Sequence, residues 1–163
     1  MINHCDLIEI INKASCFNLQ FRKDTRKERP LSPIYYRWNV QFIITLPSQE
    51  FQKLKELKEK IGCGTVYALA RQTRFCVQNI SQIKTILLPF LFSLKKNLGE
   101  KKKKDLELWQ KAVEIIFRNK RKPLSVWPKS DIYSLIEIYK SSLKYKKRPR
   151  SAKWLQTAKI LFS

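Results

Sequence analysis

The stretch LIEIINKASCFNLQF, residues 7–21, changes its hydrophobic period halfway along and so sets the start of the fold. In its first half the apolar side chains recur at helical spacing, at Leu7, Ile10 and Ile11. In its second half apolar and polar residues alternate, which is the pattern of a strand with one buried face. The stretch therefore predicts a helix over 4–14 that runs directly into a β-strand.

The rest of the chain repeats this change of period. Alternation returns over 34–46, after the charged and proline-broken residues 24–33, which predicts a long antiparallel hairpin. Beyond it we expect a helix from an N-cap at Ser48 to Gly62 or Gly64, strands over 65–70 and 74–79, a helix over 81–96 bent at Pro89, a helix that reaches Phe117, and a helix capped by Ser130. This order predicts the α+β class, an α-β-β-α-β-β-α unit followed by further helices.

The chain combines a globular composition with a large excess of positive charge. Among 163 residues, 34 are Lys or Arg and 13 are Asp or Glu, a formal charge of +21, yet 44% are hydrophobic. This charge favours a polyanionic partner, and the apolar content excludes a disordered basic tail. The longest apolar run, at 86–92, is far shorter than the ~20 residues of a transmembrane helix, so no membrane partner is expected.

Zinc and serine-histidine chemistry find no support in the sequence. No two of the four cysteines form a Cys-x-x-Cys pair, and His4 is the sole histidine. The cysteines are expected to be reduced residues of cores or strands.

The C-terminal part of the chain is especially basic. From Lys120 onward there are twelve Lys or Arg and two acids, with the densest cluster at 146–150. We interpret residues 1–143 as the α+β domain and residues 144–163 as a basic, polyanion-binding extension.

Several stretches occur in the order and spacing of a known family: LIEIINKASCF (7–17), IGCGTVY (61–67), FCVQNISQIKTILLPFL (75–91), KKKKDLELWQKAVEII (101–116) and PLSVWPKSDIYSLIEIYKSSL (123–143). Over about residues 6–143 the chain resembles the single-motif form of the LAGLIDADG homing endonuclease and maturase family. The resemblance implies that family's fold, with a curved antiparallel sheet whose concave face lies on nucleic acid.

Aligned on the family's name-giving motif, the first helix keeps its apolar face and loses its acids. The acid that binds the divalent metal in the family aligns with Ala14, and an earlier acid aligns with Asn12. Three positions that hold small residues in the family hold larger or charged ones here: Ile8, Glu9 and Lys13. The resemblance therefore implies a catalytically dead motif, with no catalytic or metal-binding residue, no cofactor, and no homodimer through residues 7–14. The apolar face of the helix is then expected to be covered by an RNA-associated protein or by the chain's own C-terminal helices.

The polar positions of the predicted strands fit contact with nucleic acid. Side chains that pair well with base edges and phosphates follow one another on the outward positions, with no acid among them: Asn18, Gln20, Arg22, Arg37, Asn39, Gln41, Arg74 and Gln78. Two basic runs that lack compensating acids in the sequence are expected to contact phosphates: Lys101, Lys102, Lys103 and Lys104, and then Lys144, Lys146, Lys147, Arg148 and Arg150. Tyr145 and Trp154 are available to stack on unpaired bases.

These expectations lead to an RNA-binding protein that is not an enzyme. The loss of the cutting site, the loss of the symmetric helix contact and the added C-terminal charge favour RNA over DNA. Only 3 Gly stand against 17 Ile and 24 Lys, a bias typical of AT-rich coding such as that of organellar genomes. We therefore expect a structural component of the mitochondrial ribosome that binds ribosomal RNA beside neighbouring proteins in the matrix. The alternatives are an intron maturase that assists RNA splicing and an active homing DNA endonuclease.

Overall fold

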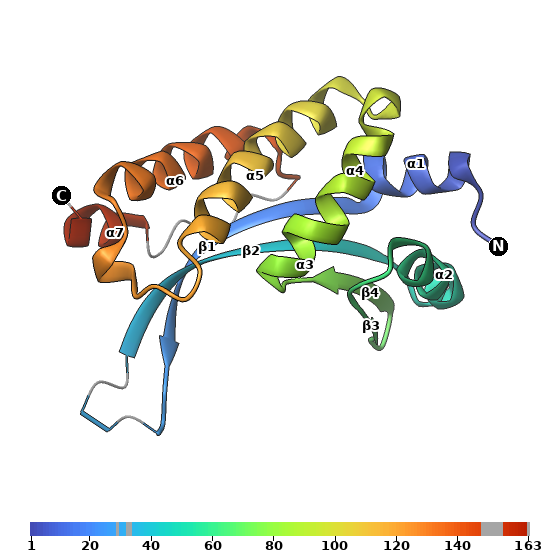
Figure 1. Ribbon diagram of the computed structural model, residues 1–163. Coiled ribbons are helices and arrows are strands. Elements are labelled where there is room, and N and C mark those ends of the chain that lie inside the picture. Colours follow the sequence, from blue (N-terminus) through green and yellow to red (C-terminus); the bar gives the residue numbers. More distant parts are fainter. Residues whose placement is uncertain (29, 32–33, 148–154, 163) are drawn as a thin grey trace.

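The structure is a computed structural model that describes residues 1–28, 30–31, 34–147 and 155–162. Its helices are α1 (His4–Ala14), α2 (Phe51–Ile61), α3 (Ile80–Gln82), α4 (Leu88–Leu94), α5 (Glu100–Arg118), α6 (Lys129–Ser142) and α7 (Leu155–Phe162). The strands are β1 (Ser15–Thr25), β2 (Ile34–Pro47), β3 (Thr65–Ala68) and β4 (Gln72–Val77). The predicted α-β-β-α-β-β-α order is confirmed (Figure 1). No helix in the described ranges is long and apolar enough to cross a bilayer.

The four strands form one curved antiparallel sheet in the order β1-β2-β4-β3. β1 and β2 make the predicted hairpin, in which Phe17 lies opposite Phe42, and β4 pairs with the far side of β2. This register puts the odd positions of β1 and the even positions of β2 on one face, so the buried side chains of both strands face the core together. Ile43 of β2, an odd position, lies on the other face opposite Cys16.

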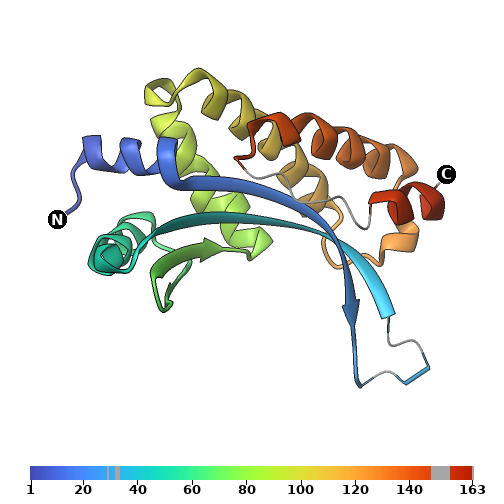
Figure 2. The same cartoon turned by 180° about the vertical axis from the view of Figure 1, so that it is seen from behind.

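The helices cover that apolar face and leave the other face open. α5 lies in front of the strands in Figure 1 and behind them in Figure 2. Its Trp109 ring lies 5.3 Å from Phe17 and 6.4 Å from Phe42, and all three side chains are buried. Trp38, the other tryptophan of the core, is buried against Phe21. Each such side chain contributes about 2–3 kcal/mol through removal of apolar area from water.

The apolar face of α1 is buried inside the chain itself. Leu7, Ile10 and Ile11 are at most 8% exposed, because α1 packs on β1 and β2. Burial of the three residues was predicted, but the expected cover was wrong. The sheet supplies it, since α1 runs without a loop into β1 and folds back over the start of the hairpin.

Two serines predicted to cap helices do not do so. Ser48 opens a 3-10 turn over Ser48–Glu50 that precedes α2, and α6 has already begun at Lys129. A proline, Pro47 or Pro128, stands before each turn with φ near −57° and −56°, which starts the helical path ahead of the serine. The predicted end of α2 is confirmed, because Gly62 takes φ +92° and donates its N–H to Lys58 O.

The helix expected over 81–96 is interrupted rather than simply bent. A π-helical turn covers Ile83–Leu87 between α3 and α4, and the Leu88 N–H donates to Ile83 O, five residues back. Pro89 follows at the first turn of α4, where its missing N–H removes one helical hydrogen bond. The wider turn lets the chain pass the proline ring.

Candidate nucleic-acid interface

The open face of the sheet carries the polar side chains that the alternation predicted. Asn18 lies opposite Gln41, Gln20 opposite Asn39, and Arg22 opposite Arg37, while Arg74 of β4 lies opposite Thr45 of β2. These side chains are half-buried or exposed on the face away from the core. The sheet therefore presents a mainly polar surface built from three strands, interrupted where Cys16 lies opposite Ile43.

A row of amides crosses this surface. Asn18 Nδ2 donates to Gln41 Oε1 at 3.5 Å, and Gln41 Nε2 donates to Gln78 Oε1 at 3.1 Å. Each amide keeps donor and acceptor capacity beyond these bonds, so the row can pair with the edges of bases.

The two arginines at the hairpin end are partly neutralised by an acid that the prediction omitted. Asp24 lies one outward position beyond Arg22, at 3.5 Å from Arg22 Nη2 and 2.5 Å from Arg37 Nε. The carboxylate relieves the repulsion between two cations that stand opposite each other on neighbouring strands. The net charge of the trio is +1, and both arginine side chains remain at least 40% exposed.

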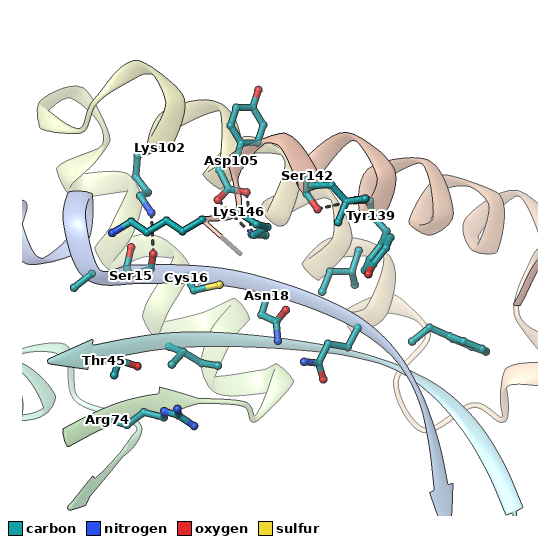
Figure 3. A pocket seen from close by; sticks show the side chains of 18 of the residues that line it. Ser15, Cys16, Asn18, Thr45, Arg74, Lys102, Asp105, Tyr139, Ser142 and Lys146 are labelled. Atoms are coloured by element: carbon teal, nitrogen blue, oxygen red, sulfur yellow. Dashed lines mark hydrogen bonds and ion pairs between the residues drawn. The ribbon is translucent and has the colours of Figure 1, made fainter. Parts of the chain in front are cut away.

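A groove of about 1310 Å³ runs along β1, from Lys13 at the end of α1 to Lys23 towards the hairpin turn. Side chains from β1, α5, α6 and the start of the C-terminal extension line it (Figure 3). Asp105 of α5 lies in it at 3% exposure, with both carboxylate oxygens 3.4 Å from Lys146 Nζ. Lys102 reaches into the same place from one turn earlier on α5.

Three lysines in this region donate to main-chain carbonyls of the α1–β1 junction. Lys102 Nζ donates to Ser15 O at 2.9 Å, Lys146 Nζ donates to Phe17 O, and Lys147 Nζ donates to Lys13 O. β1 is an edge strand, and these ammonium groups lie over its start. The start of the C-terminal extension is thus bonded to the beginning of the sheet. We name Lys102, Asp105 and Lys146 the groove cluster.

Burial shifts the pKa values of Asp105 and Lys102. It raises the pKa of Asp105, against the opposing charges of Lys146 and Lys102. Burial also lowers the pKa of Lys102, although Asp105 acts in the other direction. Neither charge is fully compensated by its neighbours.

The basic runs predicted from the sequence do not act as units. Lys101 and Lys104 are exposed, but Lys103 pairs with Glu100 at 3.2 Å, and Lys102 and Lys146 turn inward. The expectation that both runs lack compensating acids is therefore wrong for Lys103 and Lys146. Residues three apart on α5 lie on the same side of the helix, which brings Glu100 within reach of Lys103. Asp105 lies on the buried side of α5, where Lys146 reaches it.

The remaining residues predicted to bind nucleic acid are either exposed or lie outside the part of the chain that the structure describes. Lys144 lies over the Tyr145 ring at 5.2 Å from its centroid and is exposed, as is Lys147. Arg148, Arg150 and Trp154 lie outside the described residues. Sequence reasoning missed two members of the site, Asp24 and Asp105, although the place of Asp105 in the buried stripe of α5 was a usable signal.

The motif end of α1 offers little to a divalent cation. Ala14 lines the groove where the resemblance requires an acid, and the nearest lining carboxylate, Asp105, is held by an ammonium group. Within the described ranges, no three His, Cys, Asp or Glu side chains gather as metal ligands would.

The fold described above, a helix that enters a curved sheet with a polar outer face, is that of the LAGLIDADG endonucleases. The sequence pattern of the family described as LAGLIDADG endonuclease matches residues 14–113, and the chain belongs to that family. No curated protein sequence matches the chain.

Solved structures of homing endonucleases share the fold. The homing endonuclease I-TnaI superposes with a TM-score of 0.70 at 15% identity, over 99% of both chains. I-AabMI bound to uncleaved DNA gives 0.69 at 21% identity, over 95% of this chain and 48% of its own. I-SmaMI bound to cleaved DNA gives 0.70 at 17% identity, over 100% of this chain and 49% of its own. The chain thus spans nearly all of I-TnaI and about half of the other two, and at these identities the likeness shows the fold alone.

Proposed function

We propose that this LAGLIDADG protein is a catalytically inactive, RNA-binding structural component of the mitochondrial ribosome, acting in the matrix. The observation that carries the proposal is the contrast between two parts of one surface. The outer face of the sheet keeps amide and guanidinium groups suited to nucleic acid, whereas the motif end of α1 holds Ala14 beside lysines.

Charge at the motif end argues against metal-dependent hydrolysis. Phosphodiester cleavage by this family rests on divalent cations held by carboxylates. Here the single acid of the groove cluster faces two ammonium groups, which repel a divalent ion. A lysine can bind a phosphate at this place but cannot supply the missing metal ligand.

The exposed side of α1 argues against the homodimer expected of a single-motif nuclease. Glu9 and Lys13 form an ion pair at 2.7 Å, with side chains 60% and 74% exposed. Packing a second copy of α1 there would bury both charges, and desolvation of such a pair costs several kcal/mol. A chain that stays monomeric has no twofold surface for a palindromic DNA site, which favours RNA.

Crosslinking in extract of the native organelle tests the proposal. The protein is crosslinked to nucleic acid, the attached fragments are sequenced, and its sedimentation is followed on a gradient. Crosslinks in ribosomal RNA together with co-sedimentation through a high-salt wash support a ribosomal subunit. Crosslinks confined to an intron support the maturase, and crosslinks to DNA contradict RNA binding.

Membership of an endonuclease family makes DNA cleavage the second candidate. A magnesium-dependent assay on a library of DNA targets decides it, with Asp105→Asn and Asp6→Asn as paired variants. Cleavage that either substitution abolishes contradicts the inactive protein, and the absence of metal-dependent products supports it.

The sheet face itself is tested by removal of two charges. Arg22→Ala with Arg37→Ala should weaken RNA binding by about 10-fold to 100-fold and lower the salt slope by about two. The control, Lys58→Ala with Lys60→Ala, removes the same charge from exposed positions of α2 and should change affinity less than about threefold. Equal losses for both pairs would exclude a specific role for the sheet.

A further inference from the structure

A second basic surface lies at the turn between α5 and α6, away from the open face of the sheet. We define the turn patch as Lys120, Arg121, Lys122 and Lys129, with Trp127 between them. The groove is lined by the start of α5 and the end of α6, whereas the turn joins the opposite ends of these two helices, so the patch is separate from the site described above (Figures 1 and 2).

The charge of Asp131, in the first turn of α6, acts on Lys122, but the two side chains form no ion pair. Arg121, Lys122 and Lys129 are exposed, and no ion pair in the described ranges includes any of them. Asp131, the acid nearest in sequence, is buried and already accepts hydrogen bonds from Arg118 and Asn119. The surface therefore presents its positive charge to solvent.

The backbone that carries these cations is fixed by hydrogen bonds. Lys122 N–H donates to Asn119 O at 3.2 Å, and the Trp127 indole donates to Lys122 O at 3.1 Å. Arg121 takes φ +66°, the left-handed conformation that a tight turn requires. Lys120 is held over the Phe117 ring at 4.2 Å. A fixed backbone reduces the entropy that is lost when the cations of the turn bind phosphates.

The start of α6 adds a second, independent attraction for anions. The helix has 14 residues and begins at Lys129 after Pro128, without a side-chain cap. Its first amide groups and the positive end of its dipole thus lie within the turn patch. Val126 is 60% exposed beside half-buried Trp127, which provides an apolar surface for a sugar or base edge.

We propose that the turn patch binds the phosphate backbone of a second RNA segment, so that one molecule bridges two segments. The identity of the polyanion rests on the proposed function, whereas the surface does not. Spaced cations, open helix amides and an apolar rim match a phosphodiester chain better than an acidic peptide, whose charges lie on flexible side chains.

A bridging assay tests this inference with the full chain. An immobilised RNA hairpin captures a fluorescent copy of the same hairpin only if the protein binds both. The turn variant is Lys122→Glu with Lys129→Glu, and the control is Lys58→Glu with Lys60→Glu on α2. Unfolding curves of both variants are compared with wild type, so that loss of structure is recognised. A third variant, Arg121→Gly, removes one cation while keeping the left-handed turn.

We expect the turn variant to keep binding to one hairpin within about threefold while bridging falls about 10-fold, and the control to bridge like wild type. Arg121→Gly should lower bridging about threefold. Bridging by the turn variant that equals the control overturns the inference and leaves the sheet face untouched. Loss of all capture when Arg22 and Arg37 are alanine, with bridging lost in the turn variant, supports both sites. Capture that survives in the sheet variant and disappears in the turn variant overturns the sheet proposal alone. No capture by wild type overturns the bridging inference, and binding to a single hairpin then decides the sheet proposal.

Discussion

Two buried aspartates on the same helix pair are treated in opposite ways by the fold. Asp131 of α6 accepts hydrogen bonds from the Arg118 guanidinium and from Asn119 Nδ2, the latter at 2.8 Å, and the Arg118 bond holds its pKa below the usual range. Asp105 of α5 is reached by Lys146 at 3.4 Å, and burial raises its pKa. A planar guanidinium and an amide match the two carboxylate oxygens, while one ammonium group does not.

From this difference we infer that Asp131 has a structural role, whereas the groove cluster is a candidate binding site. The Asp131 network joins the end of α5 to the start of α6 and fixes the turn patch. The groove cluster lies in an open groove beside the sheet's polar face. Its two ammonium groups share one carboxylate, so positive charge remains available to a ligand. Poorly compensated, desolvated charges are typical of binding sites.

The largest expected effect is the removal of the Asp131 carboxylate. Asp131→Ala should destabilise the protein by about 2–3 kcal/mol, because the buried Asn119 amide loses an acceptor and Arg118 loses its partner. Urea unfolding near neutral pH measures the change. Glu137→Ala removes an acid from an exposed pair with Lys140 and should cost less than about 0.5 kcal/mol. Similar losses for the two variants would show that the network is not structural.

A smaller effect is expected in the groove cluster. Lys146→Met should cost about 1–2 kcal/mol, since it leaves Asp105 with Lys102 as its remaining cation and frees Phe17 O. Asp105→Asn in the same chain should recover part of this loss, giving a coupling of about 1 kcal/mol in a double-mutant cycle. Additive losses would mean that the two side chains do not interact.

The two aspartates should respond to pH with opposite signs. A depressed folded pKa means that ionised Asp131 stabilises the fold above its ordinary value of 3.8, and this contribution is lost as pH falls below 3.8 through the folded pKa. A raised folded pKa means that Asp105 lowers stability as pH rises from 3.8 through its folded pKa. The free energy of unfolding of each variant is therefore measured across the acid range. The stability of Asp131→Asn should approach that of wild type at low pH. The stability of Asp105→Asn should increase relative to that of wild type as pH rises. Parallel curves contradict the assignment.

The smallest effect sharpens the division within the lysine run. Lys103→Ala breaks an i,i+3 pair with Glu100 and should change stability by less than about 0.5 kcal/mol. Lys102→Ala should instead change both stability and RNA affinity, because Lys102 Nζ lies at the β1 edge inside the groove. Filter binding at two salt concentrations and thermal unfolding separate the two lysines.

Periodicity predicted most of the fold because the spacing of apolar residues within one strand or helix indicates which of its faces is buried. The hairpin register and the burial of Leu7, Ile10 and Ile11 follow from that rule. The caps at Ser48 and Ser130 were wrong because prolines just before them begin the turn earlier. The π turn before Pro89 depends on packing around the ring, which spacing does not describe.

The sequence by itself determined the α+β order of elements, the polar face of the hairpin and the excess of positive charge. These are local or additive properties of the chain. Only the tertiary structure decided that Asp105 meets Lys146, 41 residues away, that Asp24 pairs with two arginines, and that Lys147 bonds to Lys13 O. Contacts between distant residues depend on how the sheet and helices pack, and Coulomb interactions over a few ångströms then decide which charges remain available to a ligand.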